Sequence, residues 1–293
     1  METPPACGRL ETMKTARLTL AAASVCLGLS LDCLAETVEL TSVKDNTLIQ
    51  DPSLALSAGA GMSFYAGRVG TNGGQTLRRG LLAFDIASAI PEGSVVTSVS
   101  LTLRCSKVPS GSGPQSIKLH RTLADWGEGT SVAFGGGGAP ATPGDATWNH
   151  RFYPNVSWAT PGGEFVASPS GAATVAGIGF YTWNSTPEMI ADVQAWLDDP
   201  SSNFGWTVIG NEQTPQQVRR LETKESIAAW RPKLVVEFEP PSSNPADLNG
   251  DGVVNGADLA ILLSAWGGSG PADLDGDGAV TGADLAILLG AWN

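Results

Sequence analysis

Cysteine, histidine and basic residues are scarce in this chain of 293 residues. It has four cysteines and two histidines, and its 17 lysines and arginines are outnumbered by 29 aspartates and glutamates, so the net charge is −12. Nucleic-acid binders carry clustered lysine and arginine, and this composition therefore argues against a nucleic-acid partner. The excess of acidic over basic residues fits calcium, neutral ligands or cationic partners better. Glycine (36) and proline (19) are abundant, which favours turn-rich β structure.

The first 35 residues have the layout of a secretory signal peptide. Met13 is a second start and is followed by a short basic stretch, the apolar run 18–31 and the small residue Ala35 at a plausible cleavage point. We therefore interpret residues 1–35 as a signal peptide with its true start at Met13. We expect a bacterial protein that is secreted, either extracellular or at the cell surface. No later run is apolar for 18 residues, so no transmembrane span is expected in the mature protein.

Only one cysteine, Cys105, lies beyond the expected cleavage point, so the exported chain cannot form an internal disulfide. Cys105 ends the alternating run that starts at Val99 and shares its apolar face. We interpret it as a buried packing residue rather than as a nucleophile.

The chain divides near residue 244. Residues 240–246 are rich in proline and serine and predict a short, stiff linker. They separate a large domain, residues 36–239, from a small one, residues 247–293. The small segment holds seven aspartates and no basic residue.

The large domain has the pattern of many short strands separated by glycine- and proline-rich turns. Strands are expected at Thr37–Thr41, Met62–Ala66, Arg79–Phe84, Val96–Cys105, Ile117–His120, Trp206–Ile209 and Lys233–Phe238. Helices between strands are absent, which excludes a parallel α/β architecture. The expected fold is mostly β, a jelly-roll-type β-sandwich with one helix, followed by a small all-α domain.

The one helix of the large domain is expected after Thr186, which can cap it, with Pro187 at the first helical position and an apolar stripe up to Leu197. His120 is expected to be exposed on the polar face of its strand. Core positions are expected for four tryptophans: Trp183, Trp196, Trp206 and Trp230.

Two segments of the small domain match a twelve-residue calcium loop position by position. Oxygen side chains stand at positions 1, 3, 5, 9 and 12, a glycine at position 6 allows a sharp turn, and position 7 offers its carbonyl. The expected ligands are Asp247, Asn249, Asp251, Val253, Asn255 and Asp258 in the first loop and Asp273, Asp275, Asp277, Ala279, Thr281 and Asp284 in the second. Carboxylates so closely spaced repel one another until a cation relieves them. We therefore expect two EF-hand-like calcium loops that bind two Ca²⁺ ions.

Each loop leads into the same helical sequence, 257–266 and 283–292, in which Leu259, Leu262, Leu263 and Trp266 share one face. The duplicated loops and the single helix after each make this segment similar to a type I dockerin. The resemblance implies calcium-dependent folding and a cohesin-like or cell-surface protein as partner. Many dockerins carry a Ser/Thr pair at loop positions 10 and 11, where this chain has Gly256-Ala257 and Gly282-Ala283.

The large domain resembles the DNRLRE-type domains, extracellular bacterial β-sandwiches of which some are classed as carbohydrate-binding modules. The matching stretches are Arg78–Ile86, Ile90–Val96, His120–Gly129, Ala146–Trp148, Asn203–Trp206 and Arg231–Val236. This resemblance implies a polysaccharide or cell-surface glycan as ligand.

A sugar binder needs flat aromatic rings beside polar groups. Trp126, Trp148 and Trp158 lie in or beside glycine-rich loops, and Arg151 could pair with the carboxylate of an acidic sugar. These four residues form the candidate sugar patch, although each tryptophan could instead anchor a loop from the core.

Catalytic motifs are not found: there is no Gly-x-Ser-x-Gly elbow and no His-Glu-x-x-His. The favoured function is therefore a non-catalytic glycan-binding module attached through the calcium domain. Two alternatives remain open, a structural or adhesion protein of the cell surface that binds no sugar, and a polysaccharide-degrading lyase or hydrolase.

Overall fold

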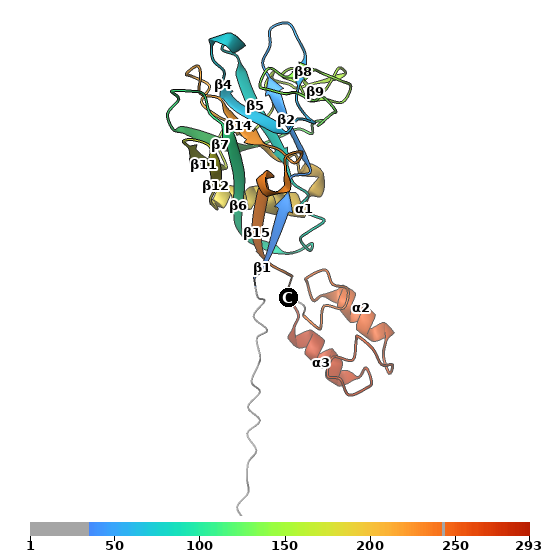
Figure 1. Cartoon of the computed structure of the whole chain (residues 1–293). Coiled ribbons are helices and arrows are strands. Elements are labelled where there is room, and N and C mark those ends of the chain that lie inside the picture. The colour runs from blue at the N-terminus through green and yellow to red at the C-terminus, as the bar shows by residue number, and fades with distance from the viewer. Residues whose placement is uncertain (1–34, 242–243) are drawn as a thin grey trace, which may run out of the picture. The chain divides into compact units, whose positions relative to one another are not determined.

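The computed structural model describes residues 35–241 and 244–293 (Figure 1). The predicted signal peptide, residues 1–35, lies outside the described residues except for Ala35, and residues 242 and 243 of the predicted linker lie outside them as well. Within the described chain, no helix combines the length and the apolar character needed to cross a bilayer. Two parts follow, a β-rich body (residues 36–239, the β body) and a helical tail (residues 246–293, the tail), and each is described by itself.

The β body is built on one sheet of eleven strands, all paired antiparallel. The pairing order is β1-β15-β6-β14-β4-β5-β13-β7-β11, with β12 beside β6 and β2 beside β5. The strands are β1 Glu36–Thr41, β2 Lys44–Ile49, β4 Ser63–Arg68, β5 Leu77–Ala83, β6 Val95–Lys107, β7 Gln115–Arg121, β11 Gly171–Val175, β12 Gly179–Trp183, β13 Trp206–Ile209, β14 Arg219–Glu222 and β15 Lys233–Glu239. Two small ribbons pair β3 Leu56–Ser57 with β8 Ala139–Pro140 and β9 His150–Phe152 with β10 Val156–Ser157.

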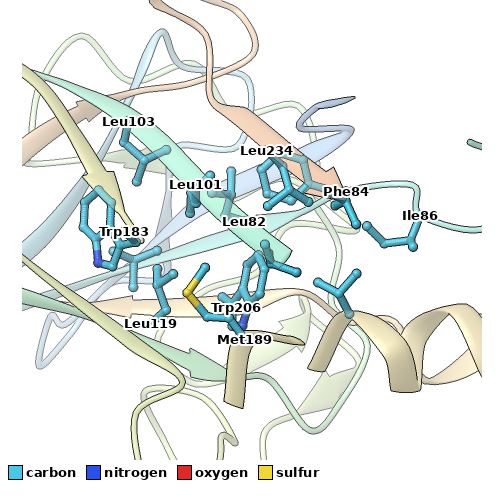
Figure 2. Close-up of a cluster of buried hydrophobic side chains, with 14 of the residues drawn as sticks. Leu82, Phe84, Ile86, Leu101, Leu103, Leu119, Trp183, Met189, Trp206 and Leu234 are labelled. Carbon is cyan, nitrogen blue, oxygen red and sulfur yellow. The ribbon is translucent and has the colours of Figure 1, made fainter. Parts of the chain in front are cut away.

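The sheet curls because β4 takes part in both of its halves. Along Ser63–Ala66 it pairs with β14, and at Gly67 and Arg68 it pairs with β5. Gly67 has a φ of 116°, which a residue with a side chain rarely adopts. Leu101 of β6 and Leu82 of β5, from opposite halves, belong to one buried cluster (Figure 2). The mostly β fold is confirmed, and the jelly-roll sandwich type stays a prediction.

All seven expected strands are present, five of them predicted from alternation, and β6 shows why alternation succeeds. Its buried side chains alternate with more exposed ones from Val99 to Cys105, so one face lies on the core. Cys105 is buried and free, as expected. β2, β11, β12 and β14 were not predicted. In β2 the polar residues Asp45, Asn46 and Thr47 are as buried as Leu48, so hydropathy does not alternate along it.

The helix α1, Pro187–Asp198, begins and ends close to the predicted positions. Thr186 caps it, accepting a 3.0 Å hydrogen bond from the backbone N–H of Met189. Met189 and Trp206 lie together in the core, in agreement with the predicted apolar stripe (Figure 2). Trp183 and Trp196 are buried as predicted, whereas Trp230 is only half-buried and lies 3.8 Å below the guanidinium carbon of Arg104.

The prediction of an exposed His120 is wrong, since its side chain is 6% exposed. The segment that follows residue 163 covers the outer face of β7 here. The His120 ring meets the Phe165 ring edge-on at 5.4 Å, and its Nδ1 donates to the carbonyl oxygen of Val166 at 2.9 Å. The polar face of this strand is therefore not a solvent face.

The tail has two helices, α2 Gly256–Ser264 and α3 Gly282–Gly290. Its buried hydrophobic residues are Ala246, Val254 and Leu262 from the first repeat and Ala272, Val280 and Leu288 from the second. Each residue of the first set has its counterpart 26 positions later, so the two repeats contribute equally to one small core.

Candidate calcium loops and candidate sugar pocket

The first loop, residues 247–258, is folded around the side chain at its first position. Oδ1 of Asp247 accepts from the backbone N–H of Gly250 at 2.8 Å, and Oδ2 accepts from that of Gly252 at 2.7 Å. Gly252, at loop position 6, has a φ of 87°, which confirms the predicted need for glycine there. Oδ1 of Asn249 and Oδ1 of Asp251 accept from backbone N–H groups two residues further on, both at 2.9 Å. The loop is thus curled with its oxygens turned inward.

The second loop, residues 273–284, repeats this geometry. Asp273 accepts from Gly276 at 2.9 Å and from Gly278 at 2.8 Å. Asp273, Asp275 and Asp277 bring one carboxylate oxygen each to within 4.8 Å of one another, and in the described chain no other three histidine, cysteine or acidic side chains converge as closely. Like charges at this separation destabilise one another unless a cation lies between them.

The carboxylates at position 12 are buried and belong to both the loop and the helix. Asp284 Oδ1 accepts from the N–H groups of Leu274 and Asp275 at 2.7 and 3.1 Å, and Oδ2 accepts from that of Thr281 at 2.6 Å. Asp258 repeats these bonds in the first loop. The donated N–H groups hold the charged form and lower the pKa of both carboxyls, with the N–H of Thr281 or Asn255 contributing most.

Position 9 of each loop caps the helix that follows. Asn255 and Thr281 accept with their side chains from the N–H groups of Ala257 and Ala283 at 2.8 and 3.2 Å. Together with Asp258 and Asp284 they form capping boxes. This capping role could have been predicted from the spacing Asn-x-x-Asp and Thr-x-x-Asp in the sequence.

The residues present fit calcium. This ion takes oxygen ligands from carboxylates, amides and backbone carbonyls, and each loop offers these at the expected spacing. The residues that would hold an ion are Asp247, Asn249, Asp251, Val253, Asn255 and Asp258, and in the second loop Asp273, Asp275, Asp277, Ala279, Thr281 and Asp284. No basic side chain follows Asp247, so no protein cation competes for these oxygens within the tail.

Each loop is bonded to the end of the other repeat. Val280, in the second loop, donates to Gly268 at 2.7 Å and accepts from Gly267 at 2.9 Å. Val254, in the first loop, accepts from the backbone N–H of Asn293 at 3.2 Å and donates to its side-chain Oδ1 at 2.7 Å. The two halves of the tail therefore complete one another.

The predicted single apolar face of the first helix is divided in the structure. Leu262 is buried and Leu259 packs beside it, but Leu263 and Trp266 are about half exposed. The same holds 26 positions later for Leu289 and Trp292. The tail thus presents the same large apolar side chains to solvent twice: Ile261, Leu263 and Trp266, and Ile287, Leu289 and Trp292.

In the β body, two of the three tryptophans of the candidate sugar patch are in the core. Trp126 is 0% exposed and Trp158 is 4% exposed. The indole Nε1 of Trp126 donates to the carbonyl of Phe204 at 2.9 Å, and that of Trp158 donates to the carbonyl of Thr147 at 3.0 Å. Both rings anchor loops, so neither offers a face to a ligand in this structure.

Trp148 is the partly buried member of the patch. It lines a pocket of about 550 Å³ together with Asn149, and the other lining residues are Gln50, Asp51, Pro52, Arg68, Gly74, Gln75 and Thr76. The guanidinium carbon of Arg79 lies 5.0 Å from the Trp148 ring centroid. Arg79 is itself fixed by two bonds to Glu212, at 2.7 and 3.0 Å. The ring is therefore held in place beside amide, carboxylate and guanidinium groups.

Arg151 does not line this pocket. Its guanidinium donates to the carbonyl of Asp125 at 3.2 Å and lies 5.7 Å from the ring centroid of Phe152. The structure does not bring it together with Trp148. Sequence patterns did not indicate the other residues around the pocket. Gln50 and Gln75 in particular come from separate loops and belong to no motif.

The tail is similar to a known family of protein domains. Residues 245–291 match the model of the family described as the dockerin type I domain. This match supports the calcium-binding role of the tail. No curated protein sequence matches the chain.

Proposed function

We propose that this protein is an extracellular, non-catalytic binding protein whose tail attaches it to a partner in a calcium-dependent way and whose β body binds a polysaccharide. The observation that carries the proposal is the pair of inward-turned acidic loops in a segment that matches the dockerin type I domain. The partner proposed for such a tail is a cohesin-like protein.

Calcium would act in the tail as a folding ligand. Bound between the loop oxygens, it supplies positive charge that offsets the repulsion of the aspartates. A segment of this size without disulfides buries little apolar surface, so metal binding contributes much of its folding free energy. Helices α2 and α3 begin at residues that belong to the loops, and their order therefore depends on the loops.

The exposed apolar side chains of α2 and α3 supply a surface for the partner. Leu263 and Trp266 recur as Leu289 and Trp292, all about half exposed. Large apolar and aromatic side chains of this kind are the common anchors of protein interfaces. Because Gly256-Ala257 and Gly282-Ala283 stand at loop positions 10 and 11, the apolar residues rather than hydroxyl groups would determine which partner binds.

The sugar-binding half of the proposal rests on the pocket at Trp148. A tryptophan ring can stack on the apolar face of a pyranose, while Gln50, Gln75 and Asn149 can exchange hydrogen bonds with its hydroxyls. Arg68 and Asp51 add one charge of each sign at the pocket wall. This lining suits a neutral or weakly charged saccharide.

The tail is tested with the full-length protein and a panel of cohesin domains in calcium and in EDTA. Binding in calcium that disappears in EDTA is expected. A double variant, Trp266→Ala and Trp292→Ala, should weaken binding while leaving the calcium content unchanged. Binding that persists in EDTA, or a double variant that binds as well as the wild type, would contradict the tail proposal.

The β body is tested on a glycan array and in polysaccharide affinity gels. Trp148→Ala should weaken retention by about tenfold, which corresponds to the loss of one stacked ring. Phe134→Ala is the matched control, because Phe134 is a fully exposed aromatic side chain that does not line the Trp148 pocket. A protein that binds no glycan would favour the structural alternative, and release of reducing ends or unsaturated products would favour an enzyme.

A further inference from the structure

One of the two oxygens of a buried carboxylate in the β body has no hydrogen-bond donor among the described residues. Asp45, on β2, is fully buried. Its Oδ2 accepts from the backbone N–H of Lys224 at 3.0 Å and from the hydroxyl of Ser42 at 3.4 Å. Its Oδ1 is buried and has no hydrogen-bond donor among the described residues. A carboxylate oxygen buried in this way is strongly disfavoured unless a proton or a cation meets it.

A second buried carboxylate oxygen without a donor belongs to Glu225. Its Oε1 pairs with the ammonium of Lys224, whereas Oε2 has no partner in the described part of the chain. Glu225 is the strongest electrostatic influence on Asp45: burial first, and then the charge of Glu225, raise the pKa of Asp45 well above its usual value. Because Lys224, the residue next to Glu225 in the chain, donates its backbone N–H to Asp45, the two acidic side chains lie in one small region.

The local charges do not balance. Glu128 joins the region, since its Oε1 accepts from the backbone N–H of Asp45 at 2.9 Å and lies 3.0 Å from the ammonium of Lys224. Lys224 is thus shared by Glu128 and Glu225. The neighbouring Lys44 is bound elsewhere, to Asp125 at 2.9 Å and to the carbonyl of Trp126 at 2.6 Å. The region thus holds three carboxylates, from Asp45, Glu128 and Glu225, and one ammonium, from Lys224, which leaves two negative charges uncompensated.

We propose that Asp45 Oδ1 and Glu225 Oε2 are ligands of a divalent cation of the calcium class inside the β body, separate from the loops of the tail. Two positive charges match the two that the local residues lack. Calcium takes several oxygen ligands, so carbonyl oxygens and water would complete the coordination that the two carboxylates begin. An ammonium group already fills the space between Glu128 and Glu225, which makes Glu128 a supporting residue.

The site would tie together three parts of the chain that are distant in sequence. Asp45 lies on β2, Glu128 in the loop between β7 and β8, and Glu225 just after β14. The backbone carbonyl of Glu128 also accepts from Nδ2 of Asn46 at 2.8 Å, next to Asp45. An ion here would stabilise the β body by linking these segments. Its removal would lower the thermal stability of the sheet.

The test uses the full chain with the tail loops disabled by Asp247→Ala, Asp251→Ala, Asp273→Ala and Asp277→Ala. After dialysis against micromolar calcium, we expect metal analysis to find one calcium ion per chain. We also expect the unfolding temperature of the β body, followed by near-ultraviolet circular dichroism, to fall when EDTA is added. Adding Asp45→Asn or Glu225→Gln should remove both the ion and the response to EDTA.

Glu237→Gln is the matched control, because Glu237 is an exposed acid on β15 whose carboxylate makes no contact with the acidic region. It should change neither the calcium content nor the response to EDTA. Should the loop-disabled chain bind no calcium and unfold at the same temperature with and without EDTA, the proposal is overturned. Asp45 Oδ1 would then carry a proton rather than contact a metal ion. Because the tail loops are disabled in every protein compared, failure here leaves the proposed function untouched.

Discussion

The indole Nε1 of Trp206, on β13, donates a 2.8 Å hydrogen bond to Oδ2 of Asp192, on the buried face of α1. The Trp206 ring also meets the Trp196 ring edge-on, with centroids 4.8 Å apart. Nε of Arg121 lies 3.6 Å from the other oxygen of Asp192. Helix α1 is therefore fixed to the sheet by a polar contact as well as by apolar packing.

Replacing Asp192 tests this contact. Asp192→Ala leaves the buried Trp206 N–H without its acceptor, which should lower the free energy of unfolding by about 1–3 kcal/mol. Urea unfolding followed by tryptophan fluorescence measures the change. Glu188→Ala, at an exposed position on the same helix, should cost less than about 1 kcal/mol. Equal costs for the two variants would show that the bond contributes nothing specific.

Calcium removal should unfold the tail. In the full-length protein, EDTA should reduce the helical circular dichroism signal by the share that α2 and α3 contribute, and excess calcium should restore it. The reason is the mutual repulsion of Asp273, Asp275 and Asp277, whose oxygens lie within 4.8 Å. An unchanged helical signal after complete calcium removal would contradict this.

The position-12 carboxylate should matter for both loop and helix. Asp284→Asn keeps the size of the side chain but loses the charge that accepts from Leu274, Asp275 and Thr281. We expect the calcium affinity of the tail to fall by at least about tenfold in titration calorimetry. Thr281→Ser retains the capping hydroxyl and should stay within about threefold of wild type. A larger loss in Thr281→Ser than in Asp284→Asn would reverse the assigned roles.

Acidification should destabilise the β body through His120. Burial is the main reason why the pKa of His120 lies below its usual value. The hydrogen bond to Val166 and the charge of Glu212 oppose this shift, whereas the charges of Lys118 and Arg79 add to it. A proton therefore binds more tightly to the unfolded chain, so stability is retained above about pH 6.5 and is lost as the pH falls below that value. Urea unfolding between pH 7.5 and 5 measures the slope, which should be shallower in His120→Gln. Because His150 is present in both proteins, equal slopes would exclude His120 as the cause.

Gly59 should not tolerate a side chain. A Cβ there would lie 1.7 Å from the carbonyl oxygen of Glu128, a backbone atom that cannot move away cheaply. Gly59→Ala should lower the free energy of unfolding by about 1–3 kcal/mol or more. Gly137→Ala is the control, since a Cβ at Gly137 meets nothing within 4 Å. Thermal unfolding measures the stability of both variants. Equal stability of Gly59→Ala and Gly137→Ala would show that the loop carrying Glu128 adapts freely.

Sequence patterns predicted the tail better than the β body because its ligands are close together in the chain. Twelve consecutive residues determine each loop, and the φ of 87° at Gly252 follows from that spacing alone. Strands with one side facing solvent, such as β6, were predicted equally well from the sequence. Strand β2 was not, because Asp45, Asn46 and Thr47 are buried by polar partners from other parts of the chain.

The candidate sugar patch shows the limit of local reasoning. Trp126, Trp148 and Trp158 stand in similar glycine-rich surroundings in the sequence, yet only Trp148 keeps part of its ring exposed. What buries Trp126 is a cluster with Leu48 and Leu81, from strands that are distant in the chain. His120 was misjudged for a similar reason, since the segment at Phe165 that covers it lies 45 residues later.

The bonds that join Val254 to Asn293 and Val280 to Gly267 bear on how the tail would take up its ions. Neither loop closes by itself, because each is completed by the far end of its twin. Filling one loop would order the end that the other requires, so the two ions would bind cooperatively. The saturation curve of the tail would then be sigmoidal, and the module would switch between empty and full over a narrow range of calcium concentration.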